Sequence, residues 1–188
     1  MNKLDICNRA LLMLKKNFIT ALDEDTLDAN YCNFLYDNIK AEVLGVYPWS
    51  CALKKVSLQS INQKGGLDYP YTFKLPQLLL KAIYVNNTKD YQKVGDLLFC
   101  KTNNIDLIYT YNIEEEKLDS YVAHLITLKL ALELSYSIKN DMSYSNNLKK
   151  LYDENFAKAC NLDSKNGANI ILEKEEGLYF STWIGARD

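Results

Sequence analysis

The side chains that could perform chemistry are few in this sequence and poorly grouped. The chain of 188 residues contains one histidine, His124, inside a strongly apolar helical pattern. A general base, a nucleophile or a metal ligand needs partner groups at a suitable spacing, and His124 has none in the sequence. The run Glu114-Glu115-Glu116 could form a metal or acid cluster, but it is more typical of a solvated helix start. We therefore expect no catalytic activity, metal or cofactor, and interpret His124 as a packing or interface residue.

The glycine and cysteine patterns also point away from a reactive site. Gly65-Gly66 precedes no helical pattern and lacks a following Lys-Ser or Lys-Thr, so we interpret it as a turn rather than a phosphate loop. The five cysteines are scattered without CxxC spacing, which predicts reduced, buried side chains in a cytoplasmic setting. We expect no signal peptide, because Met1-Asn2-Lys3-Leu4-Asp5 lacks an unbroken apolar segment, and no membrane span, because no apolar stretch is long enough.

The charge balance gives no net attraction toward nucleic acid or anionic lipid. Lysine and arginine total 22 against 24 acidic residues, for a net charge of −2. Paired basic positions occur at Lys15-Lys16, Lys54-Lys55 and Lys149-Lys150, and each could contact phosphate. Isolated pairs of this kind are more typical of a solubilising surface. The 14 tyrosines suit subunit interfaces, although buried tyrosines in a mixed fold would give the same count.

Two helices are predicted in the first 46 residues. Apolar residues recur every three or four positions over residues 4–18, which indicates an amphipathic helix ending near Asn17. Asp23 is the expected N-cap of a second helix that continues to Val46. Because the connection is short, we expect the two helices to pack as an antiparallel hairpin.

A Pro-Trp corner separates this helical pattern from a strand pattern. Pro48 lacks a backbone N–H and disfavours helical geometry in the residue before it, so the second helix should stop there. Trp49 brings a large apolar surface to the same place, and its indole N–H needs one partner. We interpret Trp49 as core packing at the corner, with a subunit contact as the alternative.

Residues 53–113 read as a small antiparallel sheet of short strands. Apolar and polar residues alternate there, and Gly or Asn pairs separate the segments. The strand-like segments are 56–60, 71–75, 79–85, 91–94, 97–100 and 107–111.

Helical periodicity returns at Glu114. The pattern over residues 121–134 is apolar on most of its circumference and predicts a central buried helix. Ser143 or Ser145 could cap a fourth helix. The predicted fold is therefore α+β: an antiparallel bundle of about four helices (residues 1–52 and 114–162), interrupted by a β domain (residues 53–113).

Residues 163–188 are expected to form an extended C-terminal arm. Chain termini are usually polar, but this one carries large apolar side chains between Gly177 and Gly185. They are suited either to folding back on the same chain or to anchoring in a partner.

Short motifs in the same order along nearly the whole chain carry a family resemblance. They are Asn8-Arg9-Ala10-Leu11, Asp23-Glu24-Asp25-Thr26, Pro48-Trp49-Ser50-Cys51-Ala52, Tyr71-x-Phe73-x-Leu75-Pro76, Leu130-Ala131-x-Glu133-Leu134 and Trp183-Ile184-Gly185-Ala186-Arg187. With them the chain resembles the head-to-tail adaptor proteins of tailed bacteriophages, specifically the tail tubular protein A type of short-tailed phages. One departure is Lys15-Lys16, where the family often has a glycine.

The resemblance implies a non-enzymatic virion protein. Such adaptors assemble in the host cytoplasm as a ring, commonly of twelve copies, beneath the portal at the head-to-tail junction. The ring extends the channel through which double-stranded DNA passes without sequence-specific binding, and it is a platform for the tail nozzle or other tail proteins. No membrane is implied. By the same resemblance, portal contact is assigned to five side chains of the C-terminal arm: Tyr179, Phe180, Trp183, Ile184 and Arg187.

Two alternatives share these sequence features. A neck or tail-completion protein of a long-tailed phage would use a similar bundle and ring. A non-virion cytosolic interaction module could have the same α+β layout, and would not add to a portal ring.

Overall fold

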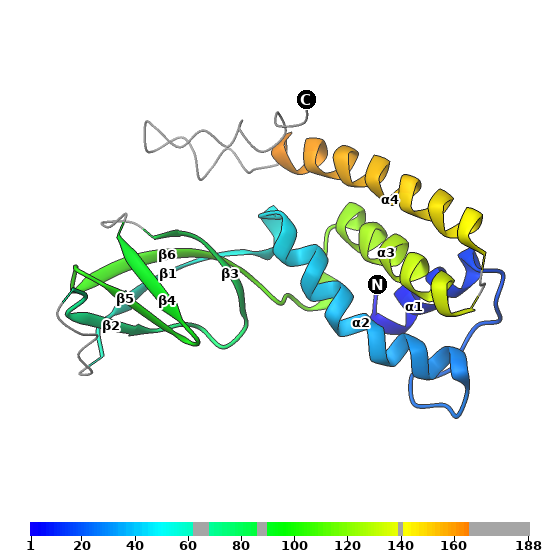
Figure 1. Ribbon diagram of the computed structural model, residues 1–188, viewed down its shortest axis with the longest axis horizontal. Coiled ribbons are helices and arrows are strands. Elements are labelled where there is room, and N and C mark those ends of the chain that lie inside the picture. Colours follow the sequence, from blue (N-terminus) through cyan, green and yellow to red (C-terminus); the bar gives the residue numbers. More distant parts are fainter. Residues whose placement is uncertain (62–67, 86–89, 139–140, 166–188) are drawn as a thin grey trace.

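The computed structural model describes residues 1–61, 68–85, 90–138 and 141–165. Within these residues the chain has the predicted α+β fold, with helices gathered at one end of the molecule and strands at the other (Figure 1). The α-helices are α1 (Lys3–Met13), α2 (Leu27–Val46), α3 (Ser120–Ile138) and α4 (Met142–Asp163). The strands are β1 (Leu53–Gln59), β2 (Tyr71–Lys74), β3 (Leu79–Val85), β4 (Tyr91–Val94), β5 (Leu97–Cys100) and β6 (Asn104–Tyr111). The short 3₁₀ helices η1 (Ser50–Ala52) and η2 (Glu115–Lys117) lie where the two parts meet.

The α3 helix is the centre of the helical part, as its apolar pattern predicts. It packs against α1, α2 and α4, and Leu125, Ile126 and Leu130 are completely buried in the core that the four helices share. The first two helices do not form the expected close hairpin. Both rest mainly on α3 and only slightly on each other, because a helix that is apolar nearly all round offers each of them a larger surface.

The α1 helix ends four residues before the predicted Asn17. Lys15 adopts the left-handed conformation with φ of 58°, and its N–H donates to the carbonyl of Leu12 over 2.9 Å. The N–H of Lys16 donates to the carbonyl of Leu11 over 3.0 Å. This is the Schellman arrangement, whose left-handed position is usually occupied by glycine. A lysine therefore occupies the conformation that a glycine would adopt without strain.

The start of α2 differs from its predicted position because a carboxylate closes the preceding loop. The N-cap is Thr26, whose Oγ1 accepts from the N–H of Ala29 over 3.3 Å, and not Asp23. Glu24 instead accepts hydrogen bonds from the N–H and the hydroxyl of Thr20, each over 2.8 Å.

The start of α4 is capped by Asp141 and not by either predicted serine. The Asp141 carboxylate accepts from the N–H of Tyr144 over 3.1 Å. Ser145 is buried inside the first turn of the helix, where its hydroxyl lies 2.7 Å from that of Ser135 on α3. Ser143 is exposed one residue beyond the helix start.

The β residues form two antiparallel sheets rather than one. Their strand orders are β1-β6-β3 and β2-β5-β4. The inner faces enclose a second hydrophobic core, separate from that of the helices, with Phe73 and Leu98 from one sheet and Leu107 from the other. We call residues 53–113 the β unit, and residues 1–52 with 114–165 the helical unit. The first and last strands of the β unit pair with each other, Leu53 opposite Thr110, so the chain enters and leaves this unit at neighbouring positions.

Candidate functional site

The Pro-Trp corner is a tightly packed joint at the end of α2. Trp49 is completely buried, and its ring lies 4.6 Å from Tyr47, 6.1 Å from Tyr121 and 5.8 Å, edge on, from Phe156 on α4. Its Nε1–H donates to the carbonyl of Val43 over 2.7 Å. The last carbonyls of a helix lack partners within the helix, so the indole caps α2 where Pro48 prevents continuation. Trp49 is thus a core residue in this chain, in agreement with the first of the two interpretations.

A buried carboxylate fastens the corner to the end of α4. Asp163 has no exposed surface, and its oxygens accept from the backbone N–H of Ser50 at 3.1 and 3.2 Å and from the Ser50 hydroxyl at 2.8 Å. The hydroxyl of Tyr121, in the first turn of α3, donates to the same carboxylate over 2.7 Å. One side chain therefore joins η1, α3 and α4. Asp163 belongs to α4, which corrects the prediction that an extended arm begins at this residue.

The carboxylate changes the acid–base behaviour of the groups around it. Burial, with the hydrogen bonds to Asp163 and Asp119, raises the pKa of the Tyr121 hydroxyl well above its ordinary value. Burial and the charge of Asp163 raise the pKa of Tyr47 to about 12 and that of Cys160 to about 11. These groups stay protonated at neutral pH, so they serve as hydrogen-bond donors or apolar surface and not as nucleophiles.

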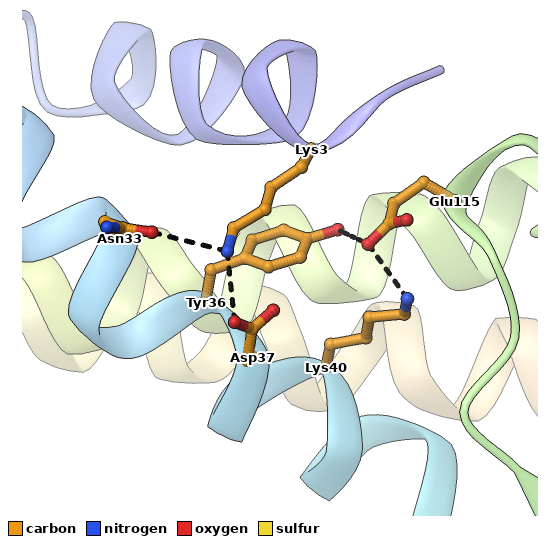
Figure 2. Close-up of polar contacts among 6 residues, drawn as sticks. All are labelled: Lys3, Asn33, Tyr36, Asp37, Lys40 and Glu115. Carbon is orange, nitrogen blue, oxygen red and sulfur yellow. Dashed lines mark hydrogen bonds and ion pairs between the residues drawn. The ribbon is translucent and has the colours of Figure 1, made fainter. Parts of the chain in front are cut away.

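The second connection between the two units is held by an ion pair (Figure 2). Lys40 of α2 is buried, and its Nζ lies 2.8 Å from Oε1 of Glu115 on η2. The hydroxyl of Tyr36 donates to the same oxygen over 3.2 Å. Burial alone would raise the pKa of Glu115, but the hydrogen bonds and charge of Lys40 outweigh it and lower the pKa. The segment that follows β6 is thereby fixed to the middle of α2.

The same network continues to the N-terminal helix. Lys3 of α1 bonds to Asp37 over 3.1 Å and to the side-chain oxygen of Asn33 over 3.5 Å, and its Nζ lies 5.0 Å from the centre of the Tyr36 ring. In Figure 2 the Tyr36 ring lies between Lys3 on one side and Glu115 on the other. The network links α1, α2 and η2.

Together these contacts make a joint fixed at two points. The first connection, after α2, is held by Trp49 and Asp163, and the second, before α3, by Lys40 and Glu115. Two fixed connections restrain both bending and twisting of the β unit relative to the helices. The arrangement is suited to holding the β unit in a fixed position relative to the helices.

Among the described residues, the other side chains singled out from sequence are not brought together in one place. His124 is exposed on α3, and burial of part of its ring together with the nearby charge of Arg9 lowers its pKa. Among the described residues, no group of three or more His, Cys, Asp or Glu side chains is placed to hold a metal ion. Cys7, Cys32, Cys100 and Cys160 are buried and free, as predicted, while Cys51 is half-buried. Gly65-Gly66 and the proposed portal-binding residues Tyr179, Phe180, Trp183, Ile184 and Arg187 lie outside the described residues.

Sequence reasoning missed the two carboxylates that hold the joint. The sequence pattern of Glu114-Glu115-Glu116 predicts a solvated run, but Glu115 turns inward to Lys40 while Glu114 and Glu116 are exposed. The helical pattern weakens around Asp163, which is why the sequence predicts an arm from this residue onward. A usable signal existed for Asp163, since it lies three or four residues after the buried Ala159 and Cys160 and so shares their face of α4.

No protein-family model matches the chain, and no curated protein gives a significant match. Within the described residues, no helix combines the length and apolar character needed to cross a lipid bilayer.

Proposed function

We propose that this chain is a head-to-tail adaptor of a tailed bacteriophage. In this role it is a non-enzymatic virion protein that assembles as a ring, of twelve copies by analogy with the family it resembles. The ring docks under the portal, extends the DNA channel and carries the tail nozzle or other tail proteins. Double-stranded DNA passes through the lumen without sequence-specific contacts.

The observation that carries the proposal is the doubly fixed joint at a family-like motif. Pro48-Trp49-Ser50-Cys51-Ala52 is one of the segments on which the resemblance rests, and it lies where α2 ends and the β unit begins. Trp49 and Ser50 of this motif make the buried contacts that fix the connection leading into the β unit to the helices. A ring subunit that supports a tail needs a rigid connection between the unit that contacts neighbouring subunits and the unit that projects from the ring.

The helical unit also carries apolar side chains that remain exposed in the single chain. Leu27 is 72% and Phe34 76% exposed, and they lie seven residues apart on one face of α2. Exposed apolar residues that share a helix face are suited to a protein contact. A subunit interface in the proposed ring would cover them.

The decisive experiment is reconstitution on the portal. Purified full-length chain is mixed with portal rings of the same virus, and the product is imaged by electron microscopy. We expect an added ring beneath each portal. Deletion of residues 177–188 should abolish this binding, because the arm carries the proposed portal contacts. Undiminished binding would refute the assignment of those residues.

A point variant tests the subunit contact separately. Phe34→Ser should leave the free energy of unfolding of the monomer within about 0.5 kcal/mol of wild type, because the side chain is exposed. It should nevertheless reduce the number of complete rings on the portal. A matched control is Leu151→Ser on α4, which also replaces an exposed apolar residue. If no ring forms with wild-type chain, the adaptor role is refuted and a non-virion interaction module becomes the better explanation.

A further inference from the structure

Two buried cysteines meet where α1 faces α2. Cys7 of α1 and Cys32 of α2 have no exposed surface, and their thiols are joined by a hydrogen bond. Both cysteines are free. Side chains of two cysteines can be joined by a disulfide only where they point toward each other at close range. The hydrogen bond between the two thiols shows that this pair meets that condition.

Ion pairs on both sides of the two cysteines fix how α1 lies along α2. Lys3 at the start of α1 pairs with Asp37 in the middle of α2 over 3.1 Å. Lys16, just after α1, pairs with Asp28 in the first turn of α2 over 3.4 Å. The two segments are therefore antiparallel. One cysteine lies four residues after Lys3 and the other four residues after Asp28, so each shares the helix face of its ion pair. The packing of both helices thus holds the two thiols opposite each other.

The other three cysteines have different neighbours. Cys51 forms a hydrogen bond with Asp119, and Cys160 lies close to the charge of Asp163. Cys100 is in the separate core of the β unit. These three thiols are therefore internal controls for any reaction of the pair between α1 and α2.

The hydrogen bond also determines which thiol of the pair ionises first. Donation from Cys7 lowers the pKa of Cys32, although burial acts in the opposite direction. The pKa of Cys7 is raised by the hydrogen bond with Cys32 and by burial. The thiolate is the nucleophile in thiol–disulfide exchange. Cys32 is therefore the attacking thiol and Cys7 the resolving thiol.

We propose that Cys7 and Cys32 form an intramolecular disulfide by exchange with a low-molecular-weight disulfide such as oxidised glutathione. The Cys32 thiolate attacks one sulfur of the reagent, breaks its S–S bond and releases a first reagent thiolate. The Cys7 sulfur, after losing its proton, attacks the Cys32 sulfur of the mixed disulfide and releases the second reagent thiolate. The two cysteine protons pass to the released thiolates, so the protein is oxidised and the reagent is reduced. This inference does not depend on the proposed adaptor role.

The bond ties α1 directly to α2, two helices that otherwise rest mainly on α3 and only slightly on each other. It joins positions 25 residues apart in the sequence. A crosslink over a loop of this size stabilises a fold mainly by restricting the unfolded chain, so we expect the Tm of the oxidised protein to rise by about 5–10 °C. A reducing compartment keeps the two thiols free, whereas an oxidising one closes the bond.

Mass spectrometry of the full-length chain tests the pairing. Because both thiols are buried, exchange needs a transient local opening, so the chain is incubated with oxidised glutathione, without air, at several urea concentrations below its unfolding midpoint. Free thiols are then alkylated and the chain is digested without reductant. We expect Cys7–Cys32 to be the main disulfide, with the other three cysteines alkylated. Absence of this disulfide at every urea concentration, or equal yields of other pairs, would overturn the proposal.

Single alanine variants supply the matched comparison. Cys7→Ala and Cys32→Ala each remove one partner, so neither should gain in Tm after oxidation. Cys51→Ala, at a half-buried position on η1, should gain as much as wild type. Thermal unfolding followed by circular dichroism compares each oxidised chain with its own reduced form, so that any loss caused by the substitution itself cancels. A wild-type Tm that is unchanged or lowered by the disulfide, or an equal gain in Cys7→Ala, would overturn the proposal.

Discussion

Replacing Trp49 measures how strongly the joint is held. Trp49→Ala removes the largest fully buried side chain among the described residues, together with its contacts to Tyr47, Tyr121 and Phe156. Truncation of a fully buried aromatic side chain costs about 3–5 kcal/mol, from lost transfer energy and the cavity left behind. We expect a loss near the upper end, because the neighbouring rings come from three different segments and cannot all relax into the space.

The more conservative Trp49→Phe separates the hydrogen bond from the packing. Phenylalanine keeps most of the apolar surface but leaves the carbonyl of Val43 without its donor. A buried acceptor that loses its partner costs about 1–3 kcal/mol. We therefore expect about 2 kcal/mol for Trp49→Phe, clearly less than for Trp49→Ala.

Urea unfolding followed by circular dichroism at the helical minimum measures both values, since Trp49 packs in the helical core. Leu12→Ala, at an exposed position on α1, is the control and should change the free energy of unfolding by less than about 0.5 kcal/mol. A loss below about 1 kcal/mol for Trp49→Ala would refute the account of the corner as a packed joint. Equal losses for both Trp49 variants would show that the hydrogen bond, not the packing, dominates.

Three further predictions concern the end of α1 and the two carboxylates. Lys15→Gly should raise the free energy of unfolding by about 0.5–1 kcal/mol in the same urea assay, because glycine adopts the positive φ of this position without strain; a destabilised variant would contradict the assignment. Asp163→Ala should cost about 3 kcal/mol, because donors of Ser50 and Tyr121 lose a buried acceptor, and Asp163→Asn, which keeps one oxygen, should cost less. Glu115 has its folded-state pKa below the ordinary value of 4.5, so the unfolded state binds more protons and stability rises with pH between the two values. The contribution of Glu115 is therefore lost as pH falls through its folded-state pKa, and Glu115→Gln should flatten the acid limb of stability against pH; an unchanged limb would refute the role of the Lys40 pair.

Local signals in the sequence predicted the structure correctly where nearby residues alone determine the backbone conformation. Pro48 ends α2 at Val46, as predicted, because proline acts on its own neighbours whatever surrounds them. The alternation Tyr71-x-Phe73 gave β2, and the apolar circumference of residues 121–134 gave the central helix. In each case the signal, either a hydrophobic period or a helix-breaking proline, is contained within a short stretch of sequence.

Features that depend on distant partners could not be predicted. The loop after α1 is held by Asn8, whose side-chain amide donates to the carbonyl of Ile19 and accepts from its N–H, over 2.9 and 2.8 Å. Nothing around Asn17 reveals this contact. The division of the strands into two sheets and the inward turn of Glu115 also depend on pairings far apart in sequence. The buried role of Asp163 requires Ser50, 113 residues earlier.

The pairing of β1 with β6 makes the β unit a replaceable cassette. Leu53 and Thr110 are cross-strand partners, so the two cut points lie about 5 Å apart. A short glycine-serine linker could span that gap. Among the described residues, no buried member of the helical core lies on a strand, but Leu80 of β3 and Tyr111 of β6 pack against that core. Different β cassettes could therefore be grafted onto one helical scaffold, each presenting a different surface, provided that each supplies an apolar side chain in place of Leu80.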